Sequence, residues 1–94
     1  MKIKDIIWLE DIIEKLDRKH NVKQNEVIEV LENKPKFRFV EKGHQKGENV
    51  YAALGQTYEG RYLIVFFVYK RNGRALIISA RDMTNSERGL YEQR

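Results

Sequence analysis

The sequence predicts a single α+β domain over residues 1–94, with two N-terminal helices, a four-stranded antiparallel sheet and a short C-terminal helix. Three observations lead to this prediction. Apolar residues recur at helical spacing in the first third of the chain. Runs of β-branched and aromatic residues between turn residues, which are typical of strands, fill positions 36–81. A capping sequence after residue 82 starts the last helix.

The helical spacing predicts two amphipathic helices near the N-terminus. The first covers residues 6–19, and its apolar stripe consists of Ile6, Leu9, Ile12, Ile13 and Leu16. His20-Asn21-Val22 ends this helix, because asparagine tolerates the left-handed conformation that closes a helix. The second helix runs from Gln24 to Glu32, and Pro35 stops it. Together the two helices form a layer that covers one face of a sheet.

Four sequential strands with short connections predict an antiparallel meander. They cover residues 36–41, 48–56, 62–69 and 75–81, and a polar loop between Gly43 and Gly47 joins the first two. After them, Thr84-Asn85-Ser86-Glu87 forms a capping box, which predicts a short helix that continues through Gln93.

The last two strands flank Asn72-Gly73, the strongest short-range signal for a hairpin. A two-residue turn there fixes the register of the hairpin. The predicted pairs are Arg71 with Arg74, Tyr69 with Leu76, Phe67 with Ile78, Val65 with Ala80, and Ile64 with Arg81. The face that carries Phe67 and Ile78 is then wholly apolar, so we expect the helices to pack against it.

The same register separates two cationic clusters. Arg61 and Arg81 lie at one end of the hairpin, and Lys70, Arg71 and Arg74 lie at the turn. The rise along a strand puts the clusters roughly 20 Å or more apart. They are therefore not expected to act on one phosphate.

Composition excludes several kinds of site. The chain has no cysteine, which excludes disulfides and thiolate chemistry, and its two histidines have no carboxylate at ligand spacing, which argues against a structural zinc. It contains no Walker loop, nucleophile elbow or dinucleotide-binding fingerprint. The longest apolar run, residues 62–69, is too short to span a bilayer, and the first residues lack a signal-peptide pattern. We expect a soluble, cytoplasmic protein that does not contact a membrane.

Charge is distributed unevenly along the chain. Residues 1–35 contain seven Lys and Arg against eight Asp and Glu, a net charge of −1, while residues 36–94 contain eleven against six, a net charge of +5. The strands are therefore the basic part of the chain, which favours a polyanion or an acidic protein as partner. The alternative is a basic surface that only contacts solvent.

Four groups of residues carry a resemblance to a known family. They are Lys19-His20-Asn21-Val22 after a tryptophan-led helix, Gly60-Arg61 before an apolar strand, Ser79-Ala80-Arg81 at the end of the next strand, and Glu87-Arg88 followed by Tyr91. With these residues the chain resembles the BrnT toxins over nearly its whole length. The resemblance implies a RelE-type fold, ribonuclease activity that halts translation, RNA as substrate and a co-encoded DNA-binding antitoxin as partner. A homodimer within the toxin–antitoxin complex stays open.

RNA cleavage without a metal requires a base for the 2′-hydroxyl, cations around the phosphate and an acid for the leaving 5′-oxygen. Arg61 and Arg81 suit the phosphate, because a guanidinium group matches it bidentately. Tyr91 and His20 are the candidate groups for proton transfer. We predict these four residues as catalytic, with no metal ligand and no cofactor.

Each of these side chains also has a structural interpretation. Arg81 can pair with Glu87 or with the end of the last helix, and Tyr91 can close the edge of the core. His20 can interact with the dipole at the C-terminus of its helix. His44, in its glycine-flanked loop, is free to reach a substrate, but most such histidines have no role.

Five cationic residues are predicted to bind substrate, namely Lys19, Lys70, Arg71, Arg74 and Arg88. The alternative for the three residues at the hairpin turn is that they only keep it soluble. They also suit an antitoxin-binding patch.

Three functions remain open. The first is a metal-independent endoribonuclease toxin, and the second is a non-catalytic RelE-fold module that contacts RNA or a co-encoded regulatory protein. The third is a regulatory partner whose basic sheet docks an acidic helix. Leu9, Ile12 and Leu16 keep the last two open, because BrnT toxins carry polar residues at the corresponding places.

Overall fold

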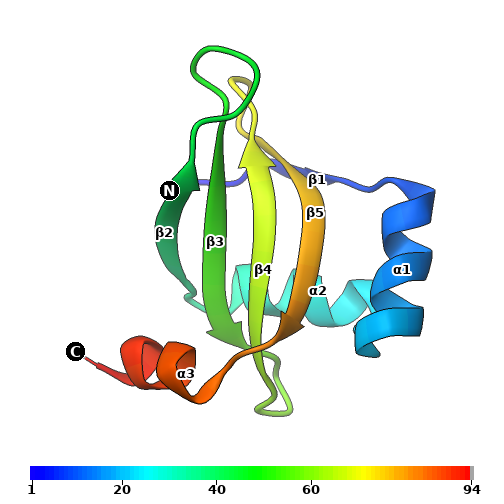
Figure 1. Cartoon of the computed structure of the whole chain (residues 1–94), viewed down its shortest axis with the longest axis vertical. Helices are drawn as coiled ribbons and strands as arrows, with labels where there is room; N and C mark the ends of the chain where they lie inside the picture. The colour runs from blue at the N-terminus through cyan, green and yellow to red at the C-terminus, as the bar shows by residue number, and fades with distance from the viewer. Residues whose placement is uncertain (94) are drawn as a thin grey trace.

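A five-stranded mixed sheet forms the centre of the computed structural model, which describes residues 1–93 (Figure 1). The strand order is β1-β5-β4-β3-β2. The strands are β1 (Asp5–Ile7), β2 (Lys36–Glu41), β3 (Asn49–Gln56), β4 (Tyr62–Tyr69) and β5 (Arg74–Asp82). Strands β2 to β5 form the predicted antiparallel meander, whereas β1 pairs with β5 in parallel. The α+β class is confirmed, but the prediction of a four-stranded antiparallel sheet was wrong.

The additional strand comes from residues that were assigned to the first helix. Ile6 pairs with Ala75 and Ile7 with Leu76, and the amide of Lys4 donates to the Gly73 carbonyl at 2.8 Å. Ile6 and Ile7 are β-branched and suit a strand as well as the apolar stripe of a helix. A three-residue strand is too short for periodicity to distinguish a strand from a helix. The helix α1 (Glu10–His20) therefore begins four residues later than predicted, after Leu9.

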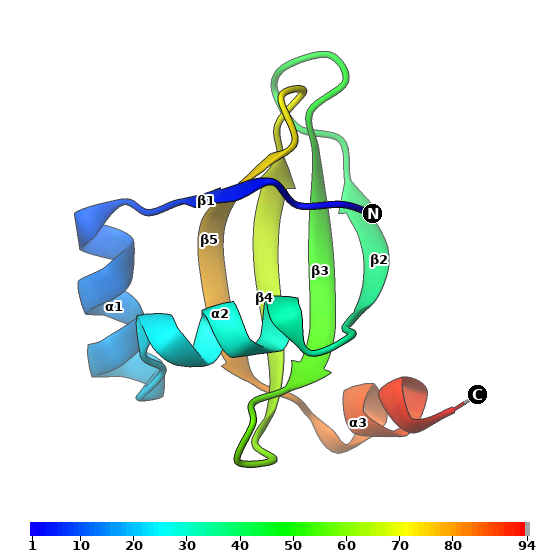
Figure 2. The same cartoon turned by 180° about the vertical axis from the view of Figure 1, so that it is seen from behind.

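Figure 2 shows the second helix crossing one face of the sheet, while α1 stands beside the β5 edge of that face. The predicted layer of two helices over the sheet is therefore only partly correct. Asn21 ends α1 in the left-handed conformation, with φ 51°. The second helix, α2 (Gln24–Glu32), has the predicted bounds and packs across β3 and β4. The core between these helices and the sheet consists of Leu16, Val22, Val27, Val30, Ala53, Leu63, Val65, Phe67, Ala75, Ile77 and Ala80.

The β4–β5 hairpin has two registers. Ile64 pairs with Arg81 and Val65 with Ala80, as predicted, but Tyr69 pairs with Ala75 and Phe67 with Ile77 instead of Leu76 and Ile78. The turn is one residue longer than predicted. The Lys70 amide donates to the Arg74 carbonyl at 2.8 Å, and only Gly73 within residues 71–73 has a positive φ, 85°. Such a turn needs a single left-handed residue, so it replaces the two-residue turn in which Asn72 would also adopt this conformation.

A β-bulge at Ile78 restores the predicted register towards the other end of β5. Phe66 pairs with Ser79 and Phe67 with Ile77, so Ile78 has no partner on β4. Ile77 therefore points into the helix-side core, where it is fully buried. Leu76 and Ile78 lie on the opposite face instead of the helix side, which corrects the predicted division of the strand.

The C-terminal helix α3 (Asn85–Glu92) packs at one end of the other sheet face (Figure 1). Its predicted capping box is present: the Glu87 amide donates to the Thr84 hydroxyl at 3.1 Å, and the Thr84 amide donates to Glu87 Oε1 at 2.9 Å. Tyr91 of α3 packs on a small cluster formed by Ala52, Leu54 and Ile64. The rest of this sheet face carries no helix, and we call it the open face.

Candidate ribonuclease site

Strand pairing gives the open face a regular arrangement of side chains. One row across the sheet runs from Lys36 on β2 through Leu54 and Ile64 to Arg81 on β5. The next row consists of Arg38, Ala52, Phe66 and Ser79. Both rows have apolar residues in the middle and a cation on β2, and the first row also ends in a cation on β5. Leu54, Ile64 and Ala52 are buried, so Phe66 is the one middle residue of these rows that is partly exposed. We call the surface formed by Lys36, Arg38, Phe66 and Arg81 the trough, because an aromatic ring flanked by cations suits a single nucleic-acid strand.

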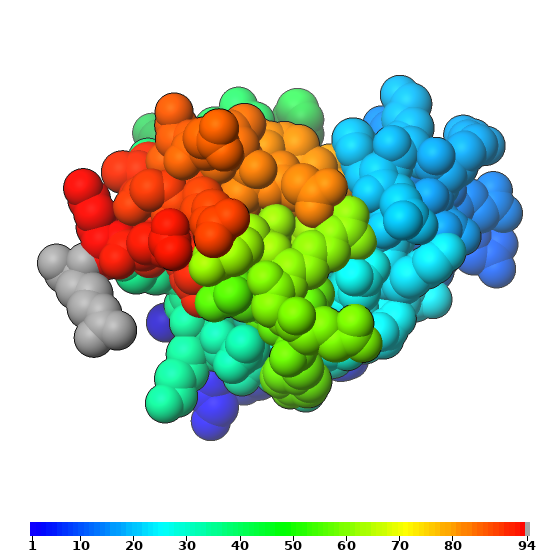
Figure 3. Space-filling view, turned by 90° about the horizontal axis from the view of Figure 1, so that it is seen from below, coloured from blue at the N-terminus to red at the C-terminus, as the bar shows by residue number. Residues whose placement is uncertain are grey.

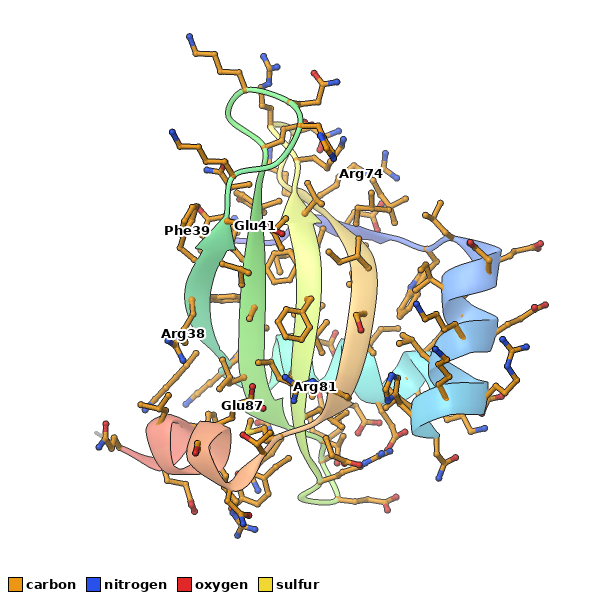
Figure 4. The ribbon with its side chains drawn as sticks, viewed as in Figure 1. Arg38, Phe39, Glu41, Arg74, Arg81 and Glu87 are labelled. Atoms are coloured by element: carbon orange, nitrogen blue, oxygen red, sulfur yellow. The ribbon has the colours of Figure 1, made fainter. Side chains whose placement is uncertain are left out.

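Arg81 is fixed at the edge of this trough by Glu87 (Figure 4). Its Nη1 donates to Glu87 Oε1 at 2.7 Å and to the Asp82 carbonyl at 3.1 Å, and its Nη2 donates to Glu87 Oε2 at 2.9 Å. The Arg81 hydrogen bond, together with the Thr84 amide, lowers the pKa of the Glu87 carboxyl from 4.5 to about 2. The pairing that formed the structural alternative for Arg81 is therefore present.

Arg81 nevertheless keeps donors for a ligand. Of its five N–H groups, Nε–H and one proton of Nη2 have no hydrogen-bond partner within residues 1–93. Its side chain is 35 % exposed, and the guanidinium carbon lies 5.6 Å from the centre of the Phe66 ring. Glu87 thus orients Arg81 without saturating it.

Arg61 differs from Arg81 in this respect. Its five N–H groups all have partners: Asp82 at 2.8 and 3.2 Å, Glu26 at 3.1 Å, and the carbonyls of His20 and Asn21 at 3.1 and 2.8 Å. These contacts join the α1–α2 corner to the ends of β4 and β5. The Arg61 hydrogen bond also lowers the pKa of the Asp82 carboxyl.

The surroundings of Arg61 are acidic. It lines a cavity of about 550 Å³ together with Glu26, Glu29 and Glu59. Carboxylates repel a phosphate, so the geometry favours Arg81 over Arg61 as the phosphate ligand. The structure places these two arginines at the same end of the hairpin, but on different sides of the sheet.

His20 and Lys19 lie with Arg61, at the C-terminal end of α1. Seen from below, the α1–α2 corner in blue and cyan and α3 in orange and red lie on opposite sides of the β3–β4 turn in yellow-green (Figure 3). His20 is close enough to Asp82, the neighbour of Arg81, to help lower the pKa of that carboxyl, and Arg61 contacts both His20 and Asp82.

Tyr91 and Arg88 lie beside Tyr62 at the lower end of the open face. The Tyr91 and Tyr62 rings meet edge to face with centres 6.0 Å apart, and Lys36 Nζ lies 5.8 Å from the centre of the Tyr91 ring. Arg88 stacks on Tyr62 with its guanidinium carbon 3.9 Å from the ring centre, and its Nε lies 3.5 Å from Glu92. Tyr91 thus closes the edge of the core, which is its structural interpretation, and it also lines a cavity with Lys36 and Tyr62.

The cations at the hairpin turn have their own acidic partners. Lys70 Nζ donates to Glu48 Oε1 at 2.9 Å, the Arg71 amide donates to Glu48 Oε2 at 3.1 Å, and Arg74 Nε lies 3.7 Å from Asp5. The hydrogen bond from Lys70 lowers the pKa of the Glu48 carboxyl. This end of the sheet is a second charged region, away from Arg81.

Sequence reasoning missed Lys36, Arg38 and Phe66. The alternation in β2 already put Arg38 on the face opposite Phe37, which packs edge to face on Phe67 in the core at 6.0 Å. What the alternation did not reveal is that the face carrying Arg38 also carries Arg81 (Figure 4). The strand pairing across four strands was needed to place them together.

Two further findings concern the residues described. No group of three or more His, Asp or Glu side chains in residues 1–93 is placed to hold a metal ion. None of the three helices in this range has the length and apolar character that crossing a membrane requires.

The family model of BrnT, the ribonuclease toxin of type II toxin–antitoxin systems, matches residues 8–87. The chain belongs to the BrnT family. A search of the curated proteins finds no match. Membership in this family implies an RNA substrate and an antitoxin partner. The matched range contains Arg61, Arg81 and Glu87, while Arg88 and Tyr91 lie just beyond it.

Proposed function

We propose that this BrnT protein is a metal-independent endoribonuclease that binds single-stranded RNA on its open face and inhibits translation when its antitoxin is absent. The observation that carries the proposal is Arg81, oriented by a bidentate carboxylate while two of its N–H donors point to no protein partner within residues 1–93. A preoriented guanidinium with unused donors is suited to stabilise charge that develops on a phosphate.

The trough supports RNA rather than a small anion. Lys36 and Arg38 on β2 face Arg81 on β5 across three strand spacings, roughly 14 Å. Phe66 lies in the row of Arg38, next to Arg81, and offers a ring on which a base can stack. A polynucleotide uses several such contacts at once, whereas inorganic phosphate uses one.

Cleavage in this arrangement proceeds by attack of the 2′-oxygen on the neighbouring phosphorus. The 2′-O–P bond forms, the bond from phosphorus to the 5′-oxygen breaks, and the products are a 2′,3′-cyclic phosphate and a 5′-hydroxyl. One group takes the 2′-hydroxyl proton and another gives a proton to the leaving oxygen. We assign Arg81 to the phosphate, with Tyr91 as a candidate for proton transfer because it lies on the same side. His20 is the second candidate for proton transfer, because it lies close enough to Asp82, the neighbour of Arg81, to help lower the pKa of that carboxyl.

Arg88 and the residues at the hairpin turn, Lys70, Arg71 and Arg74, are proposed to bind the RNA backbone away from the cleaved bond. Lys19 is proposed to do so only for long RNA, because it lies at the α1–α2 corner. The antitoxin, a DNA-binding protein in the proposal, would block the open face by direct contact. A RelE-type fold and a cytoplasmic location belong to the same proposal.

Expression of the chain without its antitoxin tests the proposal. We expect growth arrest, loss of protein synthesis, and cleavage of RNA by the purified protein that persists in EDTA. Arg81→Ala should abolish all three, whereas Arg18→Ala, at an exposed position of α1, should retain them. RNA binding without cleavage by the unmodified protein would instead support the second function, a non-catalytic RNA-binding module.

A further inference from the structure

A cavity of about 490 Å³ lies at the upper end of the open face, away from Arg81. Its floor is apolar and consists of Val50, Val68, Leu76 and Ile78, which belong to three neighbouring strands. Its wall is the loop between β2 and β3, which contributes Lys42, Gly43, His44, Gln45 and Glu48. The volume lies in the range of sites that bind small ligands or single groups of larger ones.

The floor of this cavity exists because of the bulge in β5. In the uniform register, Leu76 and Ile78 would face the helices. With the extra residue, both lie on the open face beside Val68, while Ile77 occupies the core position. Bulges that redirect side chains in this way recur next to functional sites.

The wall of the cavity is held in place by Glu48. Its carboxylate accepts from Lys70 Nζ at 2.9 Å and from the Arg71 amide at 3.1 Å, and its side chain is only 12 % exposed. The Arg71 side chain also lies near the loop, 3.9 Å from the point where a Cβ on Gly47 would stand. Glu48 thus joins the β2–β3 loop to the β4–β5 turn, and these hydrogen bonds hold the wall of the cavity in place.

The geometry points to a pocket that binds one base of the RNA substrate and sets the sequence preference of the toxin. The proposal rests on the proposed ribonuclease function. RNA sequence is usually recognised on single-stranded bases that turn out of the stack and hydrogen-bond along their edges. Here the apolar floor suits the face of a base, and His44, Gln45 and the loop backbone supply groups for its edge.

The position of the pocket on the same face as Arg81 favours RNA over an apolar side chain of a protein partner. The floor continues the rows of the trough, because Val68 follows Ile64 by four residues on β4, roughly 14 Å along the strand. A strand of RNA whose phosphate lies at Arg81 reaches the pocket within a few nucleotides. The charged residues that line the pocket are two cations, Lys42 and Lys70, and two carboxylates, Glu41 and Glu48, of which Glu48 is paired with Lys70. Lys42 is thus the cation of the lining that suits a phosphate next to the bound base.

The first test uses nucleotides alone and needs no cleavage. The full chain is titrated with AMP, GMP, CMP and UMP while amide signals are followed by NMR. We expect one of the four to shift the amides of Val68, Leu76 and Ile78 in a saturable manner. Ile78→Phe, which fills the pocket, should weaken that binding by about tenfold or more. Leu9→Phe, at an exposed position next to α1, is the matched control and should leave it unchanged.

The second test maps cleavage sites on a library of single-stranded RNA. The unmodified toxin should require one base at a fixed position a few nucleotides from the cut, and Ile78→Phe should cut without that requirement. His44→Ala provides the same test at an exposed residue if Ile78→Phe fails to fold. An unchanged preference in a folded pocket variant overturns the pocket assignment.

The two proposals fail in different ways. If the unmodified toxin cuts no RNA, the ribonuclease proposal fails, while the titration still decides whether the pocket binds a base. If no nucleotide shifts the pocket amides and Ile78→Phe releases the antitoxin, the pocket is a protein contact and the inference is overturned.

Discussion

Replacing Glu87 by glutamine isolates the ion pair with Arg81 from the cap of α3. Glutamine retains the capping function of the side chain, because its amide oxygen also accepts from the Thr84 amide. It removes the negative charge that Arg81 contacts at 2.7 and 2.9 Å. Any change in stability between the two proteins therefore measures the pair rather than the helix.

The magnitude follows from the pKa of Glu87. A fall from 4.5 to about 2 corresponds to ~3.4 kcal/mol at 1.36 kcal/mol per unit. Part of this shift comes from the Thr84 amide, which glutamine keeps, and the Arg81 side chain is 35 % exposed, so solvent screens the pair. We expect Glu87→Gln to lower the free energy of unfolding by about 1–2 kcal/mol at neutral pH.

The pH dependence distinguishes this pair from other effects of the substitution. The folded pKa of Glu87 lies below its ordinary value, so its contribution to stability is complete above 4.5 and is lost as the pH falls towards about 2. Urea unfolding of both proteins between pH 7 and pH 2.5, at roughly one-unit steps, follows this loss. The difference should shrink over the acidic part of the series. Equal stability at pH 7, or a difference that persists unchanged to pH 2.5, would refute the ion pair.

Three other substitutions test separate parts of the structure. Arg61→Ala should lower the free energy of unfolding by about 2–3 kcal/mol in urea titrations, because it leaves Glu26, Asp82 and two carbonyls without their donor. A loss of stability no larger than that of Arg18→Ala would contradict the connecting role of Arg61. Thr84→Ala should cost about 1 kcal/mol by the same measurement, and an unchanged unfolding curve would argue against the cap. Arg38→Glu should weaken RNA binding and reduce the salt dependence of that binding in a fluorescence titration, without changing the melting temperature. If the variant binds RNA as tightly as the unmodified protein, β2 is not part of the binding surface.

Most of the secondary structure was predictable because its signals are local. The bounds of α2 and β2, the order of the meander and the capping box of α3 depend on neighbours within a few residues. The parallel strand β1 was not predictable in this way. Its partner, β5, lies nearly seventy residues later in the chain, as the pairing of Asp5 with Arg74 shows, and three residues carry no readable period.

The candidate site was predictable by residue type but not by side of the sheet. Arg81 was singled out at a strand end together with its alternative partner Glu87, and both are in contact. Arg61, at the same end of the hairpin, looked equivalent in sequence. The difference between them is the number of unused donors, which depends on contacts from α1, α2 and β5 that no local pattern encodes.

The failed register prediction and the proposed base pocket have the same cause. Asn72-Gly73 favours a two-residue turn, and that turn would have placed Leu76 and Ile78 against the helices. The hairpin instead adopts a three-residue turn and a bulge at Ile78, contrary to the turn that Asn72-Gly73 favours. Conflicts between local preference and the final fold concentrate at functional sites. A deletion of Ile78 should therefore remove the bulge and give β5 one continuous register, in which Leu76 still pairs with Val68 and only the Ile78 side chain is lost from the pocket floor. Loss of base preference with retained cleavage in that protein would connect the bulge to RNA recognition, and retained preference would separate them.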